Sequence, residues 1–516
     1  MASRLLGVAR EMVLAALFGA GSGVEMDAFN VAFRVPNLLR DLFAEGAMTA
    51  AFVPAFTRTL KRDGREAAWR LGNLVINALL LLTGGAVILG IVFAYPITHA
   101  IAPRFGDTAG KLELTTRLTR VMLPFLTTVA VSVAMMGMLN SLRRFFIPAL
   151  SPAMFNVATI ACAFTFVPLM PYFGLPAIMG IAIGTLVGGA GQVLLQWPAL
   201  RKEGFRYRPV LDFKDPALRE VLGLMGPGTL GLTAVQINLF VNTYLATGEP
   251  QGAVSWLNYA FRLMYLPIGL FGISIATAAL PDIARHAADG DVPAIRRAMS
   301  RSLRMMLMLN VPATVGLMVL ASPIVSLLLE RGRFTPHDTA ATAAALMWYA
   351  PGLLAYSAVK IASPTFYSLR DSRTPVLVSV ASVAVNLLVN LSLVRAVGFR
   401  GLAAGTALAA TFNAGTLLWL LRGRLSGLEG SRIAITFAKI LAASLIMGAV
   451  AHLSVTWLTS ALPGASAAVR GIHVFGAISA GVLTLLVAAR ALRIDELDQA
   501  IALVFRRGRT VAGPAE

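Results

Sequence analysis

The chain has 516 residues, of which 57% are hydrophobic and only 13% are charged, and its mean hydropathy is +0.74. This balance excludes an ordinary soluble globular protein and indicates a polytopic membrane protein. The 44 Lys and Arg residues exceed the 25 Asp and Glu residues and give a formal charge of +19. Because a polytopic protein collects Lys and Arg in its cytoplasmic loops, this excess requires no nucleic-acid partner, and none is expected.

A helix that crosses a bilayer needs about 20 mostly apolar residues. The sequence predicts fourteen such helices and hence an all-α fold. In chain order they are expected at residues 1–20, 27–56, 72–98, 115–141, 147–170, 174–200, 218–246, 252–281, 303–329, 338–368, 374–395, 400–421, 432–458 and 468–492. Arg10 and Glu11 interrupt the first span, so it is not expected to be a cleaved signal peptide.

Lys and Arg residues are distributed unequally between alternate loops. The loops after the even-numbered spans, together with the C-terminal tail, hold 28 of the 44 cations, and the odd-numbered loops hold at most nine. The positive-inside rule therefore predicts that both termini and the even-numbered loops are cytoplasmic. Seven cations remain inside the spans and need another explanation: Arg4, Arg10, Arg34, Arg40, Arg262, Lys360 and Lys439.

The sequence also contains an internal repeat. Residues 32–34 recur at 260–262, and residues 141–143 recur at 368–370, with a spacing of 227 to 228 residues. This nearly constant offset predicts two six-helix lobes in the same orientation, a transporter architecture that works by alternating access. The predicted divisions are an N-terminal lobe at 1–215, a C-terminal lobe at 216–425, two extra helices at 426–495 and a cytoplasmic tail at 496–516. The offset further predicts that the first helix is short or that the coding start lies roughly ten residues upstream.

The two lobes differ in the charges inside their spans. Arg10 corresponds to Asn238 in the second lobe, and Arg40 corresponds to Ile268, so the first lobe keeps the charge. An ionised side chain at the bilayer centre costs about 2.5 to 3.5 kcal/mol. We therefore expect the charged groups of the first lobe to face a wet cavity or one another.

The second span carries a stripe of charge. Four of its residues share one helical face, at spacings of 7, 7 and 4: Asp27, Arg34, Asp41 and Glu45. Asn37 lies beside this stripe. Arg40 falls roughly opposite it on an ideal helix, but Pro36 removes a backbone hydrogen bond and can re-aim the following turn. The spacing alone therefore leaves the direction of Arg40 open.

These patterns support a cationic substrate pocket built by the first, second and eighth spans. Its predicted members are Arg4, Arg10, Arg34, Arg40, Arg262, Asn37 and Ser255. Guanidinium groups bind phosphate oxygens in pairs and do not deprotonate, so the set suits a pyrophosphate or a diphospho-lipid head group. The alternative is structural pairing: Arg10 with Glu11 or Asp27, Arg40 with Asp41, and Arg4 extended to the membrane surface. Lys360 and Lys439 are expected to extend to the surface or to pair locally.

Other candidate sites are weaker. Asn386 and Asn390 could coordinate a cation with Asn238 and Thr406, but amide hydrogen bonds between helices are the commoner use of such residues. Gly184 and Gly188 form a small-residue packing motif. The five histidines lack metal-ligand spacing, so no metal cofactor is expected. Neither a phosphate-binding loop nor a catalytic nucleophile motif is found, so an enzyme is not indicated.

Several motifs resemble one family of membrane proteins. They are SRLLGVAR at 3–10, PNLLR at 36–40, FAEGA at 43–47, VSW at 254–256 and RLM at 262–264. Together they resemble the MurJ (MviN) family of lipid II flippases, within the multidrug/oligosaccharidyl-lipid/polysaccharide exporter superfamily. The resemblance covers nearly the whole chain and agrees with the number of predicted spans.

The resemblance implies that the protein moves lipid II, the undecaprenyl-diphosphate-linked disaccharide-pentapeptide, from the cytoplasmic to the periplasmic leaflet of the bacterial inner membrane. Membrane lipid and the cell-wall synthesis machinery are the partners it implies. The family's cavity arginines fall on Arg4, Arg10, Arg40 and Arg262, with Arg34 as a further cation. Asp27 matches a gating position, and we assign Glu45 of the same stripe to the gate. The two C-terminal helices match a groove for the lipid tail.

The chain departs from some members of that family. Phe261 and Tyr265 flank Arg262, where some members carry acidic residues. The seventh and eleventh spans offer only asparagines where some members bind sodium through carboxylates. Membrane potential or another cation is therefore expected to drive the cycle.

Two other functions fit part of the sequence pattern. A drug or O-antigen exporter of the same superfamily is the nearer one, but a drug exporter needs an acidic intramembrane residue for its cationic substrate. A polyprenyl-phosphate glycosyltransferase belongs to a different class and would need acidic residues at a membrane face and a large extramembrane domain. The predicted loops are too short for such a domain.

Overall fold

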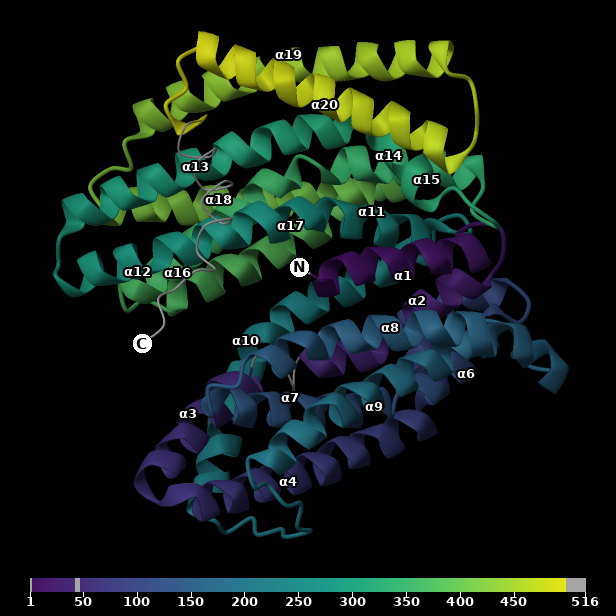
Figure 1. Cartoon of the computed structure of the whole chain (residues 1–516), viewed down its shortest axis with the longest axis vertical. Coiled ribbons are helices and arrows are strands. Elements are labelled where there is room, and N and C mark those ends of the chain that lie inside the picture. Colours follow the sequence, from purple (N-terminus) through teal and green to yellow (C-terminus); the bar gives the residue numbers. More distant parts are fainter. Residues whose placement is uncertain (1, 42–46, 498–516) are drawn as a thin grey trace. The chain divides into compact units, whose positions relative to one another are not determined.

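The computed structural model describes residues 2–41 and 47–497, and every regular element in that part of the chain is a helix. The chain divides into two compact units. The first comprises Met1–Ser255 and Arg331–Thr335, and the second comprises Trp256–Glu330 and Pro336–Glu516. Each unit has its own hydrophobic core. Figure 1 shows the helices of both units. The predicted lobe boundary at 215/216 coincides with the start of a helix, but the two units divide one helix later, so the lobe limits stay a prediction.

The first unit contains ten α-helices within the described residues. They are α1 (Ala2–Phe18), α2 (Glu25–Arg40), α3 (Ala47–Arg62), α4 (Gly64–Val92), α5 (Ala94–Ile101), α6 (Lys111–Met122), α7 (Phe125–Ser141), α8 (Phe146–Leu169), α9 (Met179–Lys202) and α10 (Pro216–Ala246). A chain of aromatic rings holds one end of this unit together. Phe56 packs on Phe52 and Trp69, with centroids 5.5 and 5.8 Å away, and Trp69 packs on Phe205 at 5.4 Å.

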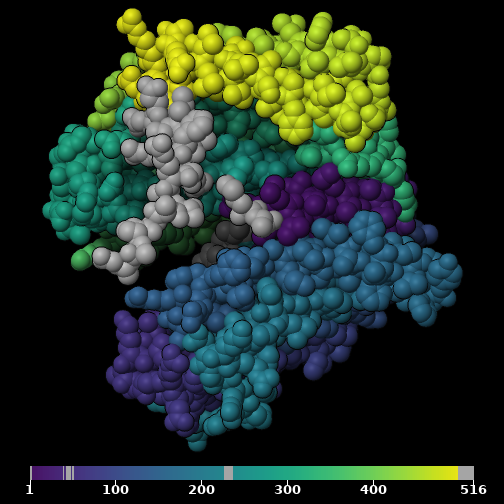
Figure 2. All heavy atoms as spheres, viewed as in Figure 1, coloured from purple at the N-terminus to yellow at the C-terminus, as the bar shows by residue number. Residues whose placement is uncertain are grey.

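The second unit contains most of α11 (Ala253–Pro267) and the helices that follow. These are α12 (Ile273–Ala288), α13 (Val292–Val319), α14 (Ala321–Leu329), α15 (Pro336–Tyr349), α16 (Gly352–Ser368), α17 (Arg373–Val397), α18 (Phe399–Arg424), α19 (Gly430–Ala461) and α20 (Ala467–Ala491). A π-helical turn, Ile268–Gly272, joins α11 to α12 directly after Pro267. The last two helices, α19 and α20, pack on each other, and α19 also packs on α13. Helices α19 and α20, coloured yellow-green to yellow, form an outer layer of this unit (Figure 2).

Ten helical segments of the described chain are long and apolar enough to cross a membrane, so the protein is a multi-pass, all-α membrane protein. Four predicted spans are not among these ten segments: they fall on α1, on α2 with α3, on α10, and on α15 with α16. The count of fourteen therefore stays a prediction. The predicted spans 72–98 and 303–329 are each two helices, broken at Phe93 and Leu320. Pro96 and Pro323 lie in the first turn of α5 and α14, where a proline costs no helical hydrogen bond.

The internal repeat is confirmed by the backbone. Helices α7 and α16 begin at residues 125 and 352, and α8 and α17 begin at residues 146 and 373, so both pairs are 227 residues apart. Arg143 and Arg370, also 227 apart, end α7 and α16 in the left-handed conformation, each with φ of 59°. Because a non-glycine side chain seldom adopts this conformation, the shared geometry shows that the two segments have the same fold.

Asp371 follows the second of these left-handed turns and fixes the start of α17. Its carboxylate accepts a hydrogen bond from Thr374 Oγ1 at 2.6 Å and bonds from the backbone nitrogens of Thr374 and Arg373, both at 3.0 Å. The guanidinium of Arg424 forms an ion pair with it. The hydrogen bonds from Thr374, supported by the charge of Arg424, lower the pKa of this carboxyl below its usual value.

Glycines bring α8 and α9 into close contact. A Cβ atom at Gly184 would lie 2.9 Å from Cβ of Cys162, and one at Gly188 would lie 2.7 Å from the ring of Phe155. The small-residue packing predicted for Gly184 and Gly188 is therefore confirmed. Gly180 is tighter still, because its Cβ would lie 2.6 Å from the backbone nitrogen of Val167.

We predict that Gly180→Ala destabilises the protein by about 1 to 3 kcal/mol, because the backbone of α8 cannot move aside as a flexible side chain could. The measurement is the melting temperature of the purified protein in detergent. Gly85→Ala on α4 is the control, since nothing lies within 4 Å of a Cβ at that position. Equal melting temperatures for Gly180→Ala and Gly85→Ala would contradict the close packing of α8 and α9.

Candidate functional site

The predicted arginines fall in both units. Arg4 and Arg10 lie on α1, and Arg34 and Arg40 lie on α2, so the first unit contains four of the five. Arg262 lies on α11 in the second unit. A pocket that contains all five arginines therefore stays a prediction, and the geometry that follows belongs to each unit separately.

Arg10 forms an ion pair with the next residue along α1. Its Nη2 lies 2.6 Å from Glu11 Oε1, and its Nε donates to the same oxygen at 3.2 Å. Both side chains are nearly buried, with 11% and 10% exposed, and the guanidinium carbon lies 5.2 Å from the ring centroid of Phe155 on α8. The pairing that we considered as the alternative is thus present at Arg10, with Glu11 rather than Asp27 as the partner.

Arg40 is paired in the same way at the end of α2. Its Nη2 lies 2.8 Å from Asp41 Oδ1. The other carboxylate oxygen accepts bonds from Asn37 Nδ2 at 3.5 Å and from Gln236 Nε2 at 3.3 Å. Gln236 was not identified from the sequence, because it lies on α10, 195 residues away from Asp41, and has no charge to mark it.

Arg34 and Arg4 complete the first unit's set. Phe33, the neighbour of Arg34, packs on Phe29 at 5.9 Å and on Phe155 at 6.3 Å, which fixes one side of α2 against α8. Arg34 is half-buried and Arg4 is exposed. The four arginines with Glu11 and Asp41 carry a net formal charge of +2. The predicted gating residue Glu45 lies outside the described residues.

Asp27 is the centre of a buried hydrogen-bond network. Its Oδ2 accepts from Lys111 Nζ at 3.0 Å and from the backbone nitrogen of Gly252 at 2.8 Å. Its Oδ1 accepts from Ser255 Oγ at 2.6 Å and from the Ser255 nitrogen at 3.0 Å. Asn30 Nδ2 donates to Ser255 Oγ at 3.1 Å. We call these five residues the Asp27 network, and it joins α2 to α6 and to the start of α11.

The Asp27 network neutralises the buried carboxylate of Asp27, whose cationic partner the sequence does not identify. Asp27 is 1% exposed and Lys111 is 4% exposed, and the Lys111 ammonium also lies 4.1 Å from the ring centroid of Phe105. Lys111 lies between the predicted spans 72–98 and 115–141, and nothing in the sequence marks it as buried, because its partner is 84 residues away on another helix. Ser255, predicted to contact substrate, is fully buried here and has a structural role, so its contact with substrate stays a prediction.

Arg262, in the second unit, contacts a polar residue of its own helix. Its Nε donates to Asn258 Oδ1 at 2.7 Å, one turn earlier on α11. The preceding residue, Phe261, stacks on Tyr265 at 6.0 Å and meets the edge of Tyr349 at 5.5 Å. Phe261 and Tyr265, which stand where some members of the family carry acidic residues, thus form an aromatic cluster with Tyr349.

The candidate cation ligands form hydrogen bonds within their own helices. Asn390 Nδ2 donates to Asn386 Oδ1 at 2.9 Å on α17, where both residues are buried. Thr406 donates to the Leu402 carbonyl at 2.8 Å on α18. Asn238, which accepts from Asn242, lies in the first unit. A cation site that combines these groups stays a prediction.

The duplicated helical fold is shared with solved membrane transporters. A solved structure titled "Inward-facing conformation of a multidrug resistance MATE family transporter of the MOP superfamily" has the same fold, with a TM-score of 0.69 at 16% identity over 83% of this chain and 96% of that chain. A family model described as "Lipid II flippase MurJ" matches residues 14–469. The chain therefore belongs to the MurJ family of lipid II flippases.

Individual relatives agree with this assignment. A probable lipid II flippase MurJ from Rhizobium meliloti is 35% identical over 93% of this chain and 90% of the relative. Another from Vibrio cholerae is 36% identical over 80% of this chain and 78% of the relative. A solved lipid II flippase MurJ in an inward closed conformation matches with a TM-score of 0.77 at 25% identity, over 96% of this chain and 98% of that chain. The family consists of transporters, so the glycosyltransferase alternative is wrong.

We predict that Lys111→Met lowers the stability of the protein by about 3 to 5 kcal/mol, because it leaves the Asp27 carboxylate buried without its cation. The double variant Lys111→Met/Asp27→Asn should be more stable than Lys111→Met alone, because it removes the uncompensated charge. Melting temperatures in detergent measure both effects, with the exposed Lys61→Met as the control. A double variant that melts at a still lower temperature than Lys111→Met would contradict the buried ion pair.

Proposed function

We propose that the protein flips lipid II from the cytoplasmic to the periplasmic leaflet of the bacterial inner membrane by alternating access, with its arginines on the diphosphate. The observation that carries the proposal is the family match over residues 14–469, which includes Arg34, Arg40 and Arg262. The relatives named as lipid II flippases extend over most of the chain and support the same substrate.

The ion pairs of the first unit explain how these arginines would hold a diphosphate. A carboxylate and a phosphate present oxygens to a guanidinium with similar geometry. Glu11 on Arg10 and Asp41 on Arg40 therefore occupy the places that phosphate oxygens would take. Pairing reduces the cost of two guanidinium groups in an apolar setting while the site is empty. A diphosphate carries more charge than either carboxylate and would displace them, and the carboxylates would pair again after release.

The same contacts argue against export of organic cations. A drug exporter would need an acidic group ready to bind a positive substrate. Three carboxylates of the first unit have cationic partners: Glu11 with Arg10, Asp41 with Arg40, and Asp27 with Lys111. The remaining formal charge of the arginine set is positive, which favours an anionic substrate.

We predict that Arg10→Ala, Arg40→Ala and Arg262→Ala each abolish complementation in cells depleted of their own lipid II flippase, although each variant inserts in the membrane at normal levels. Arg10→Lys should also fail, because an ammonium cannot form the two parallel hydrogen bonds of a guanidinium. Growth measures complementation, and immunoblotting of membranes measures insertion.

Arg58→Ala is the matched control for these variants. Arg58 pairs with Glu220 at 2.7 Å, but its side chain is 58% exposed, and surface ion pairs of this kind contribute about 0 to 1 kcal/mol. It should complement fully. Full complementation by any of the three alanine variants would remove that arginine from the diphosphate site.

A further inference from the structure

A cationic cavity lies at one end of the second unit, where α19 begins and α20 ends. Its volume is about 170 Å³, larger than the roughly 30 Å³ that one water molecule occupies in the liquid. The residues that line it come from α13, α19 and the segment after α20: Arg304, Arg432, Ile435, Thr436, Lys439, Arg493, Ile494, Asp495 and Glu496. We call it the α19 pocket.

Positive charge exceeds negative charge in the α19 pocket. Four cations and two carboxylates line it, so the lining has a net formal charge of +2. Glu496 is 4% exposed and forms a buried ion pair with Arg304. Arg432 lies 4.0 Å from Glu429, a distance at which the attraction is weak. An anion in the pocket would therefore meet a surplus of positive charge.

Arg304 has an unused hydrogen-bond donor and lines the α19 pocket. The residue is 8% exposed, and within the described chain its Nε is buried without a hydrogen-bond partner. A buried donor that lacks an acceptor costs about 1 to 3 kcal/mol, and more when it is charged. The ion pair with Glu496 neutralises Arg304 but leaves this donor unused. A ligand oxygen in the pocket would supply the missing acceptor.

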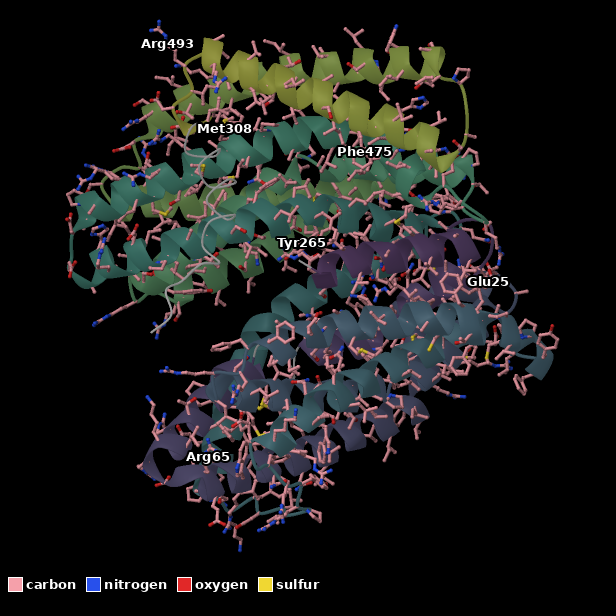
Figure 3. The ribbon with its side chains drawn as sticks, in the orientation of Figure 1. Glu25, Arg65, Tyr265, Met308, Phe475 and Arg493 are labelled. Atoms are coloured by element: carbon pink, nitrogen blue, oxygen red, sulfur yellow. The ribbon has the colours of Figure 1, made fainter. Side chains whose placement is uncertain are left out.

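Backbone geometry holds Arg493 at the rim of the α19 pocket. Arg493, labelled in Figure 3, follows α20 in the left-handed conformation, with φ of 50°. The next nitrogen, of Ile494, donates to the Ala489 carbonyl at 3.0 Å. Lys439 Nζ donates to the Arg493 carbonyl at 3.4 Å, which joins α19 to this turn. The two cations are thus fixed at the same edge, where Arg493 is exposed and Lys439 is half-buried.

The rim of the α19 pocket is also apolar. Ile435 lines the pocket and is 59% exposed, and Leu445 and Ile446 farther along α19 are 57% and 51% exposed. In a membrane protein such side chains face lipid acyl chains. The pocket therefore combines a cationic interior with a lipid-facing edge, and a basic pocket between membrane helices is the kind of site that binds anionic lipid head groups.

We propose that the α19 pocket binds the phosphate head group of an anionic phospholipid, with the acyl chains along the exposed face of α19. Lys439 and Arg493 contact the phosphate, and Arg304 Nε donates to one of its oxygens. The distribution of Lys and Arg in the loops assigns this end of the unit to the cytoplasmic leaflet. The site is independent of the arginines proposed to bind lipid II.

Binding to the purified full-length protein in neutral detergent tests this proposal. Phosphatidylglycerol should raise the melting temperature of the wild type, and phosphatidylcholine should not. The double variant Lys439→Gln/Arg493→Gln should lose at least two thirds of that shift and should retain at least fivefold less phosphatidylglycerol in native mass spectrometry. Arg490→Gln is the matched control, because it removes an exposed cation from the end of α20 that does not line the pocket.

A measurement with inorganic phosphate shows whether the pocket binds the phosphate of a lipid or free phosphate. At the same concentration of phosphate groups it should give little or no shift, because it lacks acyl chains to lie along α19. If inorganic phosphate raised the melting temperature as much as phosphatidylglycerol does, and the double variant lost this rise, the pocket would bind free phosphate. That result would overturn the assignment of a lipid as the ligand. Equal lipid retention by the wild type and the double variant would overturn the pocket itself. Flipping is not part of the readout, so either failure leaves the proposed transport function untouched.

Discussion

The cost of placing a charge in an apolar membrane governs this structure. Three ion pairs in the described parts of the chain are almost wholly buried: Asp27 with Lys111, Arg10 with Glu11, and Arg304 with Glu496. Two of these three pairs join segments far apart in the sequence and so determine which helices lie together. The Asp27 network connects α2, α6 and the start of α11, and the Arg304 pair connects α13 to the segment after α20.

Duplication gave the protein two copies of one backbone, and the charges distinguish them. Helix starts 227 residues apart and matching left-handed arginines show how closely the backbone was kept. Arg10 and Arg40 have uncharged counterparts in Asn238 and Ile268. Packing therefore explains what the two halves share, whereas the arginines that only the first half carries are the ones that we propose bind the anionic substrate.

Contacts between neighbours in the chain can be predicted from the sequence, whereas contacts between distant residues cannot. The pairs Arg10 with Glu11 and Arg40 with Asp41 could be proposed because the partners are adjacent in the chain. The contacts of Lys111 with Asp27 and of Gln236 with Asp41 could not be proposed, because the partners are 84 and 195 residues apart, respectively. Breaks in the helices were missed for a related reason: Pro312 lies inside the intact α13, whereas the break comes at Leu320. A proline in the pattern does not reveal whether packing can keep the helix whole.

The most direct test of the account is the leaflet distribution of lipid II in cells that depend on this protein alone for flipping. Depletion should leave lipid II in the cytoplasmic leaflet, out of reach of a periplasmic enzyme that cleaves its head group. Expression of the wild type should restore cleavage within minutes, and expression of Arg10→Ala should not. Undiminished cleavage after depletion would contradict the assignment of the protein as the lipid II flippase.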